Sequence, residues 1–368
     1  MTEFGIGTYI RNVVRTLARL DRESKYFLIG EPPKVAEIGS LPGNFHSVAL
    51  ASSDNTLKGN IEFRAIVRRL GCDLVHIPHL YWLPRGLPCP YVITVHDLLD
   101  HMYGARQVSA VRRKLHFHLT KRVLRRAARV LAVSQFTKNE IQKLFAIPGN
   151  RIEVVYNAID ERFLHGHATQ ADRELIAQRY LVNYPFILYA GAIRPHKNVV
   201  RTIEAFSALK NELAKEGQLP DLKLIIIGDD LSSHPRLRRT VVRSGVQHDV
   251  RFLGFVSIEI LRIFYDVAKV FVFPSLYEGF GLPPLEAMAH GTPVVTANTS
   301  SLPEVVGTAA LTVNPENVFE IQRAMQRALL DRDVREQMKE LGYAQSKRFS
   351  WTVSVSRILE VYREVAGQ

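Results

Sequence analysis

Short apolar runs alternate with longer segments of helical periodicity along the whole chain, and this alternation constrains the fold most strongly. The runs are DLVHIP, PYVITVHD, RVLAVS and RIEVVYN in the first half, and PFILYAG, LKLIIIGD, VRFLGF, KVFVFPS and TPVVTA in the second. They are rich in Val, Ile and Leu without polar alternation, which indicates strands of a parallel sheet covered on both faces. Helical patterns such as NVVRTIEAFSALKNELAKEG lie between them. The sequence therefore predicts an α/β fold with doubly wound parallel sheets.

The length of 368 residues is suited to two such domains. A polar stretch separates the strand patterns near residues 161–184, which divides the chain into domains of residues 1–165 and 166–349. Because ligand sites favour domain interfaces, we expect a cleft between the two domains.

The start of the sequence departs from this pattern. A doubly wound domain begins with a strand, but the helical pattern FGIGTYIRNVVRTLARL starts within four residues of Met1. We therefore expect that the natural first strand is missing from this sequence. Gly5 and Gly7 stand where a loop would bring backbone N–H groups close to a phosphate or an acceptor, although a plain turn into a helix is the alternative. A dinucleotide fingerprint would need glycine at position 10, which is Ile10.

Positive charge is concentrated in the first half. The net charge is +12, and residues 1–165 hold 24 Lys and Arg against 14 Asp and Glu. The basic segment, residues 106–138, contains no acidic residue and has apolar residues near helical spacing. It predicts an amphipathic helix that could bind nucleic acid, anionic lipid headgroups or a polyanionic substrate, with a merely solvated helix face as the alternative. Specific nucleic-acid binding is not expected, since no aromatic-interleaved basic surface or known module is present.

Few features suggest a disulfide, a metal site or a membrane span. Cys72 and Cys89 are the only cysteines, and no apolar stretch is long enough to cross a bilayer. The only Asp-x-Asp sequence, at residues 331–333, opens a helical segment and is typical of capping. We expect a cytoplasmic protein without a metal, which would lie at most peripherally on the inner face of a membrane.

Two carboxylates flank a glycine-rich turn in the stretch SLYEGFGLPPLEAMAHGTPVV, residues 275–295. The pattern predicts a strand, a loop, a helix that starts at Pro284 and ends at Gly291, and another strand. Glu286 is then in the first helical turn and Glu278 precedes it. Carboxylates accept hydrogen bonds from vicinal hydroxyls, so the pair predicts a site for a hydroxyl-rich ligand.

The same stretch resembles the E-x7-E signature of the family 4 retaining glycosyltransferases. The segments FILYAGAIRPHKN, RVLAVSQFTKNEI, EVVYNAID, VITVHDLL and FGIGTYIRNVVRTL also resemble that family, so the likeness covers nearly the whole chain. It implies the GT-B fold, in which two Rossmann-like domains face each other across a cleft. The second domain would bind the donor and the first the acceptor, with a last helix, residues 350–368, crossing back to the first domain.

The resemblance also implies roles for single residues. Glu278 would lie by the hydroxyls of the donor hexose, Glu286 would accept from the ribose hydroxyls, and Lys197 would pair with the diphosphate. His96 would lie near the anomeric carbon, and the neutral imidazole could donate a hydrogen bond there. The implied catalytic residues are Glu278, His96 and Lys197, and the implied donor-binding residues are Gly191, Arg194, Gly279, Phe280, Gly281, Leu282 and Glu286. The family's second basic residue directly follows the glycine, whereas here Ala192 follows Gly191 and Arg194 comes two residues later.

The implied reaction is retaining transfer of a hexose, in which the departing diphosphate takes the acceptor's proton and neither metal nor cofactor takes part. GDP-mannose is the favoured donor, ahead of UDP-sugars, and the acceptor would be a glycan or a lipid-linked sugar of a surface polysaccharide. Because lipid-linked acceptors are implied and the basic segment lies in the acceptor-side domain, the resemblance favours docking of this segment on an anionic membrane surface. Two alternatives remain: a sugar-nucleotide epimerase of the same fold, and a non-enzymatic basic protein that binds nucleic acid or anionic surfaces.

Overall fold

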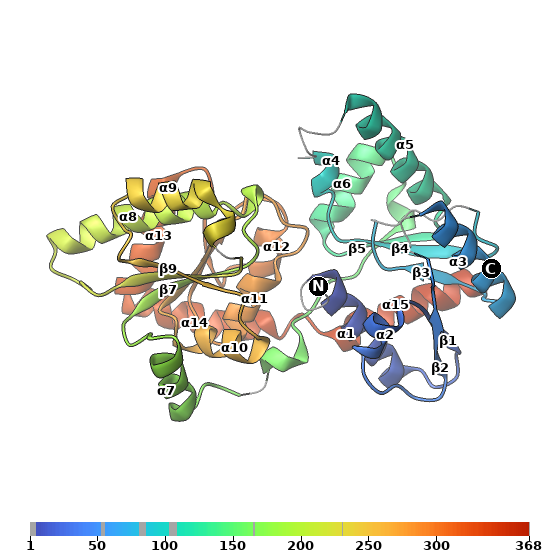
Figure 1. Cartoon of the computed structure of the whole chain (residues 1–368), viewed down its shortest axis with the longest axis horizontal. Coiled ribbons are helices and arrows are strands. Elements are labelled where there is room, and N and C mark those ends of the chain that lie inside the picture. The colour runs from blue at the N-terminus through green and yellow to red at the C-terminus, as the bar shows by residue number, and fades with distance from the viewer. Residues whose placement is uncertain are drawn as a thin grey trace. The chain divides into compact units, whose positions relative to one another are not determined.

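The computed structural model describes residues 5–52, 56–80, 86–102, 109–164, 166–229 and 231–367. The chain forms two compact units (Figure 1). Unit 1 contains residues 1–158 and 350–368, and unit 2 contains residues 159–349. The division thus falls seven residues before the predicted boundary at 165/166, because Phe163 already packs against Tyr265 and His290 of unit 2.

Unit 1 is built from parallel strands and covering helices. Its helices are α1 (Ile6–Leu20), α2 (Pro32–Ala36), α3 (Leu57–Leu70), α4 (Leu99–Met102), α5 (Ala110–Arg126), α6 (Gln135–Phe145) and α15 (Trp351–Ala366), with a 3-10 turn at Gly149–Arg151. Its strands are β1 (Tyr26–Gly30), β2 (Phe45–Ala49), β3 (Val75–Ile77), β4 (Tyr91–Val95), β5 (Arg129–Ala132) and β6 (Ile152–Val154).

The strands of unit 1 form two separate parallel sheets. One has the order β1-β2 and the other the order β3-β4-β5-β6. The apolar core of the larger sheet includes fully buried Ile93, Val95 and Leu124. The expected strands at 73–78, 90–97, 129–134 and 151–157 correspond to β3, β4, β5 and β6.

Unit 2 contains one six-stranded parallel sheet of order β12-β11-β10-β7-β8-β9. Its strands are β7 (Phe186–Ala190), β8 (Lys223–Ile227), β9 (Val250–Gly254), β10 (Val270–Phe273), β11 (Val294–Ala297) and β12 (Leu311–Val313). Its helices are α7 (Gln170–Arg179), α8 (Val199–Lys215), α9 (Pro235–Arg243), α10 (Ile258–Val267), α11 (Leu282–Ala289), α12 (Leu302–Val306), α13 (Val318–Leu330) and α14 (Arg332–Ser346). Short 3-10 turns occur at Glu161–Leu164, Pro195–Lys197 and Leu231–Ser233.

The central strands of unit 2 are fully covered, which explains their unbroken apolar sequences. Every residue of β7, β10 and β11 is buried. The order reverses between β7 and β10, since β7 leads outward to β8 and β9 whereas β10 leads to β11 and β12. Such a switch point opens a crevice at the carboxyl ends of the strands, where open α/β sheets bind ligands. The predicted α/β class with parallel sheets in two domains is confirmed.

One local prediction is confirmed by these elements. Asp331 caps α14 by accepting from the N–H of Val334 at 3.1 Å, as predicted for the Asp-x-Asp sequence. No helix among the described residues is both long and apolar enough to cross a membrane.

Candidate functional site

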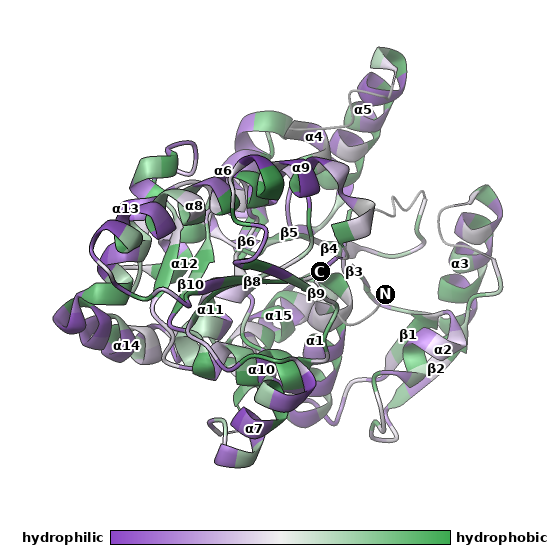
Figure 2. Ribbon diagram, turned by 60° about the vertical axis from the view of Figure 1, so that its left-hand side comes forward, coloured by the Kyte–Doolittle hydropathy of each residue, from purple (hydrophilic) through white to green (hydrophobic). Residues whose placement is uncertain are grey.

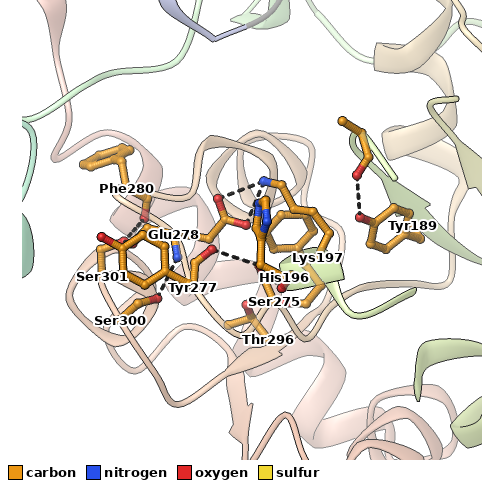
Figure 3. Close-up of polar contacts among 12 residues, drawn as sticks. Tyr189, His196, Lys197, Ser275, Tyr277, Glu278, Phe280, Thr296, Ser300 and Ser301 are labelled. Carbon is orange, nitrogen blue, oxygen red and sulfur yellow. Dashed lines mark hydrogen bonds and ion pairs between the residues drawn. The ribbon is translucent and has the colours of Figure 1, made fainter. Parts of the chain in front are cut away.

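The candidate donor site is formed by loops at the carboxyl ends of the central strands of unit 2. Gly191 and Lys197 follow β7, and Glu278 follows β10. Lys197 Nζ donates to both carboxylate oxygens of Glu278, at 2.7 and 2.8 Å (Figure 3). The two side chains are only 17% and 11% exposed. The ammonium also lies 5.1 Å from the centre of the Phe273 ring. The structure therefore brings Glu278 and Lys197 together, the two residues to which the resemblance assigns contacts with a donor hexose and a diphosphate.

The loops that carry Lys197 and Glu278 are bonded to each other. The carbonyl of His196 accepts from the N–H of Leu276 at 2.7 Å and from Ser275 Oγ at 3.0 Å (Figure 3). Asn198 lies behind them, buried and in the left-handed conformation, and its side-chain amide donates to the carbonyls of Pro274 and Pro315. Sequence reasoning missed Asn198, although an asparagine before a helix is a familiar candidate for a positive φ.

The segment after Glu278 is held by two serines that were also missed. The N–H of Glu278 donates to Ser300 Oγ, and Ser301 Oγ donates to the carbonyls of Glu278 and Phe280 (Figure 3). Gly281 has a φ of 110°, and a Cβ there would come within 2.6 Å of Leu302. These contacts fix the loop of Gly279, Phe280 and Gly281 at the start of α11.

Helix α11 begins earlier than predicted. Its first residue is Leu282, not Pro284, because Gly281 provides the N-cap and a proline fits at the second helical position. Glu286 therefore lies in the second turn and not in the first. The helix ends at Ala289, and Gly291 follows with a φ of 70°, consistent with its predicted role at the C-terminal end.

Glu286 is half-buried and unlike an ordinary carboxylate. Burial raises its pKa to about 7, although the hydrogen bond from Tyr265 opposes this shift. Tyr265 is fully buried on α10 and donates to Glu286 Oε2 at 3.0 Å. Tyr265 thus holds the Glu286 carboxylate in place, and it could not be singled out beforehand because it lies inside an apolar helical pattern.

Gly191 and Arg194 lie in the loop after β7, which meets the loop after the neighbouring strand β8. A Cβ on Gly228, which follows β8, would come within 2.2 Å of the Gly191 carbonyl oxygen, so the two loops meet only because this residue is a glycine. Arg194 is exposed and lines a cavity of about 790 Å³ together with Gly228 and Asp229. Its contact with a diphosphate remains a prediction.

His96 follows β4 in unit 1 and is half-buried. Its Nε2 is 2.9 Å from the carbonyl oxygen of Pro78, and burial lowers its pKa to about 4. Because a carbonyl only accepts, the neutral ring carries its proton on Nε2 and leaves Nδ1 as an acceptor. A ligand hydroxyl would therefore donate to His96, which reverses the direction expected from the sequence.

A chain of hydrogen-bonded side chains, of which Tyr9 and Thr94 are buried, packs against His96. The edge of the Tyr9 ring meets His96, with 4.6 Å between ring centres, and the Tyr9 hydroxyl is 3.0 Å from Thr94 Oγ1. Thr94 is bonded in turn to His76, whose other nitrogen is bonded to Tyr362 of α15. These residues come from four separate elements, so their proximity was not readable from the sequence.

Gly5 and Gly7 do not share one loop. Gly5 is the N-cap of α1 with a φ of 65°, whereas Gly7 already lies in the first helical turn. Only Gly5 needs the conformational freedom of glycine.

One group of metal-ligand residue types occurs among the described residues: His167, Asp266 and His290. Asp266 Oδ1 is 2.9 Å from His167 Nδ1 and 3.1 Å from His290 Nδ1, and its Oδ2 accepts from the N–H of Ala168. Both carboxylate oxygens are thus engaged in hydrogen bonds that attach residues 167–168 to α10 and α11.

Comparison with family models and curated proteins gives consistent matches. The model described as "Glycosyl transferases group 1" matches residues 172–345, and the model "Glycosyltransferase Family 4" matches residues 5–163. O-antigen chain mannosyltransferase B of Escherichia coli is 33% identical over 295 residues, covering 79% of this chain and 74% of that protein. Serotype-specific mannosyltransferase WbdA of Escherichia coli is 32% identical over 291 residues, covering 77% of this chain but 35% of that protein.

A solved structure supports the fold. Anabaena Alr3699/HepE in complex with UDP-glucose matches with a TM-score of 0.75 and 18% identity, over 98% of this chain and 97% of that one.

Proposed function

This chain belongs to glycosyltransferase family 4 and is a glycosyltransferase of the GT-B fold, and we propose that it transfers mannose from GDP-mannose to a surface polysaccharide. The acceptor would be a glycan or a lipid-linked sugar. The bidentate pair of Lys197 with Glu278 at the strand ends of unit 2 carries the assignment of the site. The names of the two mannosyltransferase relatives support the choice of sugar.

The proposed chemistry depends on which acceptors the three N–H groups of the Lys197 ammonium bond to. An ammonium has three N–H donors, and Glu278 takes two, so a third remains for a diphosphate oxygen. Lys197 would stabilise the charge that develops on the departing diphosphate. Glu278 would in turn accept from the hexose hydroxyls, and Glu286 from the ribose hydroxyls.

We further propose that the transfer retains the anomeric configuration and uses no metal or cofactor. Glu278 is bonded to Lys197 on both oxygens and is therefore a poor covalent nucleophile, which supports a route in which the diphosphate itself receives the acceptor's proton. His96 would accept a hydrogen bond from a donor hydroxyl through Nδ1.

The test is a panel of nucleotides and donors. GDP at a hundred times its dissociation constant should stabilise the native state by about 2.7 kcal/mol, and UDP at the same concentration by less. Purified protein with GDP-mannose, an oligosaccharide acceptor and a chelator should then form a product with the donor's anomeric configuration, seen by NMR. Greater stabilisation by UDP than by GDP would refute GDP-mannose as the donor. A requirement for a metal, or a product with the opposite anomeric configuration, would refute the proposed mechanism.

The same assay separates the alternatives. Conversion of the donor sugar without an acceptor would indicate an epimerase, and binding of nucleic acid without any transfer would indicate a basic binding protein. The family match and the glutamate and lysine pair favour the transferase.

We also propose that the basic segment docks this enzyme on an anionic membrane surface. Arg106, the first residue of the segment, lies outside the described residues, and Arg112, Arg113 and Lys114 lie exposed on α5. Val111 and Leu115 on the same helix are 77% and 57% exposed, so apolar side chains accompany the charges.

Vesicle binding tests this docking. The protein should sediment with anionic vesicles in low salt and be released by salt, while neutral vesicles should not bind it. Changing Arg112, Arg113 and Lys114 to Ser should abolish this binding, and the same change of Arg332, Arg335 and Lys339 on α14 should not. Equal binding to neutral and anionic vesicles would contradict the proposal.

A further inference from the structure

Two histidines and an aspartate from separate elements of unit 2 come together where α7, α10 and α11 adjoin. His167 precedes α7, Asp266 is in the last turn of α10, and His290 is the C-cap of α11. Figures 1 and 2 both show α7 beside α10, and α10 also contacts α11. One nitrogen or oxygen atom from each of the three side chains lies within 4.8 Å of the other two. Three atoms of the types that bind metals therefore share one position, although their residues are far apart in the sequence.

The spacing of these atoms is close to the spacing around a bound zinc ion. Asp266 Oδ1 is 2.9 Å from His167 Nδ1 and 3.1 Å from His290 Nδ1. In a tetrahedral site with metal–ligand bonds of about 2.0 to 2.1 Å, neighbouring ligand atoms are about 3.3 Å apart. The two nitrogen–oxygen distances would lengthen by roughly 0.2 to 0.4 Å to admit the ion. The two nitrogens, which lie within 4.8 Å of each other, would approach the same spacing.

The protonation of the two rings permits this exchange. An ionised carboxylate only accepts, so each histidine presents its Nδ1–H to Asp266 when no metal is bound. His290 Nε2 is buried and has no hydrogen-bond partner within the described part of the chain. No second hydrogen bond therefore fixes the tautomer of the His290 ring. Moving its proton from Nδ1 to Nε2 frees the Nδ1 lone pair for a metal and breaks no contact at Nε2.

The surroundings of Asp266 suit a cation. The side chains of Asp266 and His290 are only 3% and 2% exposed, so water competes little for an ion between them. Both α10 and α11 end here, and the C-terminal end of a helix carries partial negative charge. Asp266 Oδ2 accepts from the N–H of Ala168 at 2.8 Å, the kind of contact that orients a metal-binding carboxylate.

We propose that His167, Asp266 and His290 bind one zinc ion through the two Nδ1 atoms and Oδ1, with water as the fourth ligand. Two imidazole nitrogens favour Zn²⁺ over Mg²⁺ and Ca²⁺, which prefer oxygen ligands. The side chain of His167 is 65% exposed, so it can turn aside and admit the ion to the two buried ligands.

The zinc ion would have a structural role beside the proposed donor site. It would join residues 167–168 to the ends of α10 and α11, and His290 follows Glu286 by one helical turn. Tyr265, which donates to Glu286, also stacks on the His290 ring with 6.0 Å between ring centres. Bound zinc would therefore stiffen the surroundings of Glu286 and take no part in the transfer. Transfer in the presence of a chelator and zinc binding at this site are separate measurements, so either proposal can fail alone.

Calorimetric titration of Zn²⁺ into the untagged chain, after treatment with a chelator, tests the site. The wild-type chain should bind one zinc ion. His167→Ala and Asp266→Asn should each weaken binding at least tenfold, since losing even a group that only orients a ligand costs about 10 to 100 fold in metal affinity. His248→Ala, at an exposed position of the same unit, is the matched control and should bind zinc like the wild type. Circular dichroism verifies the fold of each variant, and His167→Ala removes only an exposed side chain.

Two further measurements locate the ion. Co²⁺ in place of zinc should give the intense visible absorption of a tetrahedral ion in the wild type and in His248→Ala, but not in His167→Ala. Zinc should also slow hydrogen exchange of the Ala168 amide at least tenfold in the wild type and leave it unchanged in His167→Ala. Equal zinc affinity in His167→Ala and the wild type would overturn the proposal, because the ion would then be bound elsewhere. Absence of zinc binding, or equally tight binding of Mg²⁺, would also overturn it.

Discussion

At the residue scale, the two charged side chains of the proposed donor site already pair with each other without a donor. Lys197 and Glu278 neutralise each other in a place where water has little access. Removing one partner therefore leaves the other as a poorly hydrated charge, in addition to any contact that it loses with the substrate. No ion pair to Glu286 occurs within the part of the chain that the structure describes, and burial raises the pKa of this carboxyl.

Replacing Lys197 by Met should lower kcat/KM by about 10² to 10³ fold, the usual effect of removing one group that stabilises a developing charge. The loss should fall mainly on kcat, because the diphosphate charge grows in the transition state. Steady-state kinetics with the donor tests this. Lys223→Met is the matched control: Lys223 pairs with Asp249 at 3.2 Å at the amino end of β8, away from the strand ends that carry the site. Equal kinetics in the two variants would contradict the role of Lys197.

Nucleotide affinity should fall as the pH drops through about 7, because a protonated Glu286 is a weaker acceptor for two hydroxyls. The free energy of unfolding should change with pH in the opposite direction. The pKa of Glu286 is raised above its ordinary 4.5, so the folded state binds more protons between these values and its free energy of unfolding decreases as the pH rises through that range.

Calorimetric titration of the nucleotide and urea unfolding, both measured from about pH 5 to 8, test the two slopes. Glu286→Gln should flatten this part of both profiles. A variant that keeps the wild-type pH profiles would show that another group titrates.

At the element scale, the loops of the site depend on a few buried side-chain amides and hydroxyls. Asn198 ties the start of α8 to the ends of β10 and β12 through Pro274 and Pro315. Ser275 and Ser301 act in the same way on neighbouring loops. These hydrogen bonds therefore attach the loops of the candidate site to the ends of the strands.

Asn198→Ala should destabilise unit 2 by about 1 to 3 kcal/mol, because it leaves two buried carbonyls without their donor. Asn211→Ala, at an exposed position of the same helix, should change stability by less than about 0.5 kcal/mol. Urea unfolding followed by circular dichroism gives both values. Similar losses of stability in the two variants would mean that the hydrogen bonds of the Asn198 side chain contribute little.

The elements that could be predicted were those with unbroken apolar sequences. Strands from β3 to β11 were all found, whereas β1, β2 and β12 were missed because FHSVA is mixed, LTV is short, and YFLIG directly follows a charged stretch. The two glutamates were singled out because they flank a glycine-rich turn, and Lys197 was singled out through its resemblance to a motif. Asn198, Tyr265 and Gly228 were not, because their roles arise from contacts between segments far apart in the sequence.

At the scale of the whole molecule, α15 follows unit 2 in the chain but packs in unit 1. Val355 and Ile358 are fully buried, Trp351 packs on Tyr9, and Ser354 Oγ donates to the carbonyl of Tyr156. The last helix therefore contributes to the stability of unit 1.

Ile358→Ala should cost unit 1 about 2 to 5 kcal/mol, the usual cost of emptying a buried aliphatic site. Hydrogen exchange should accelerate in β4 and β5 and stay unchanged in β7 and β8. Val353→Ala, at a position of the same helix that is 69% exposed, is the control and should leave both units unaffected. Equal acceleration in the two units would show that they unfold together.

The return of α15 to unit 1 has a consequence during synthesis on the ribosome. All of unit 2, residues 159–349, emerges before the helix that completes unit 1. Domains usually fold in the order in which they are made, but here the second can finish while the first still exposes the apolar face of α1. A chaperone could bind this apolar surface on the nascent unit 1. Slow translation before residue 350 would prolong the time for which the surface is exposed.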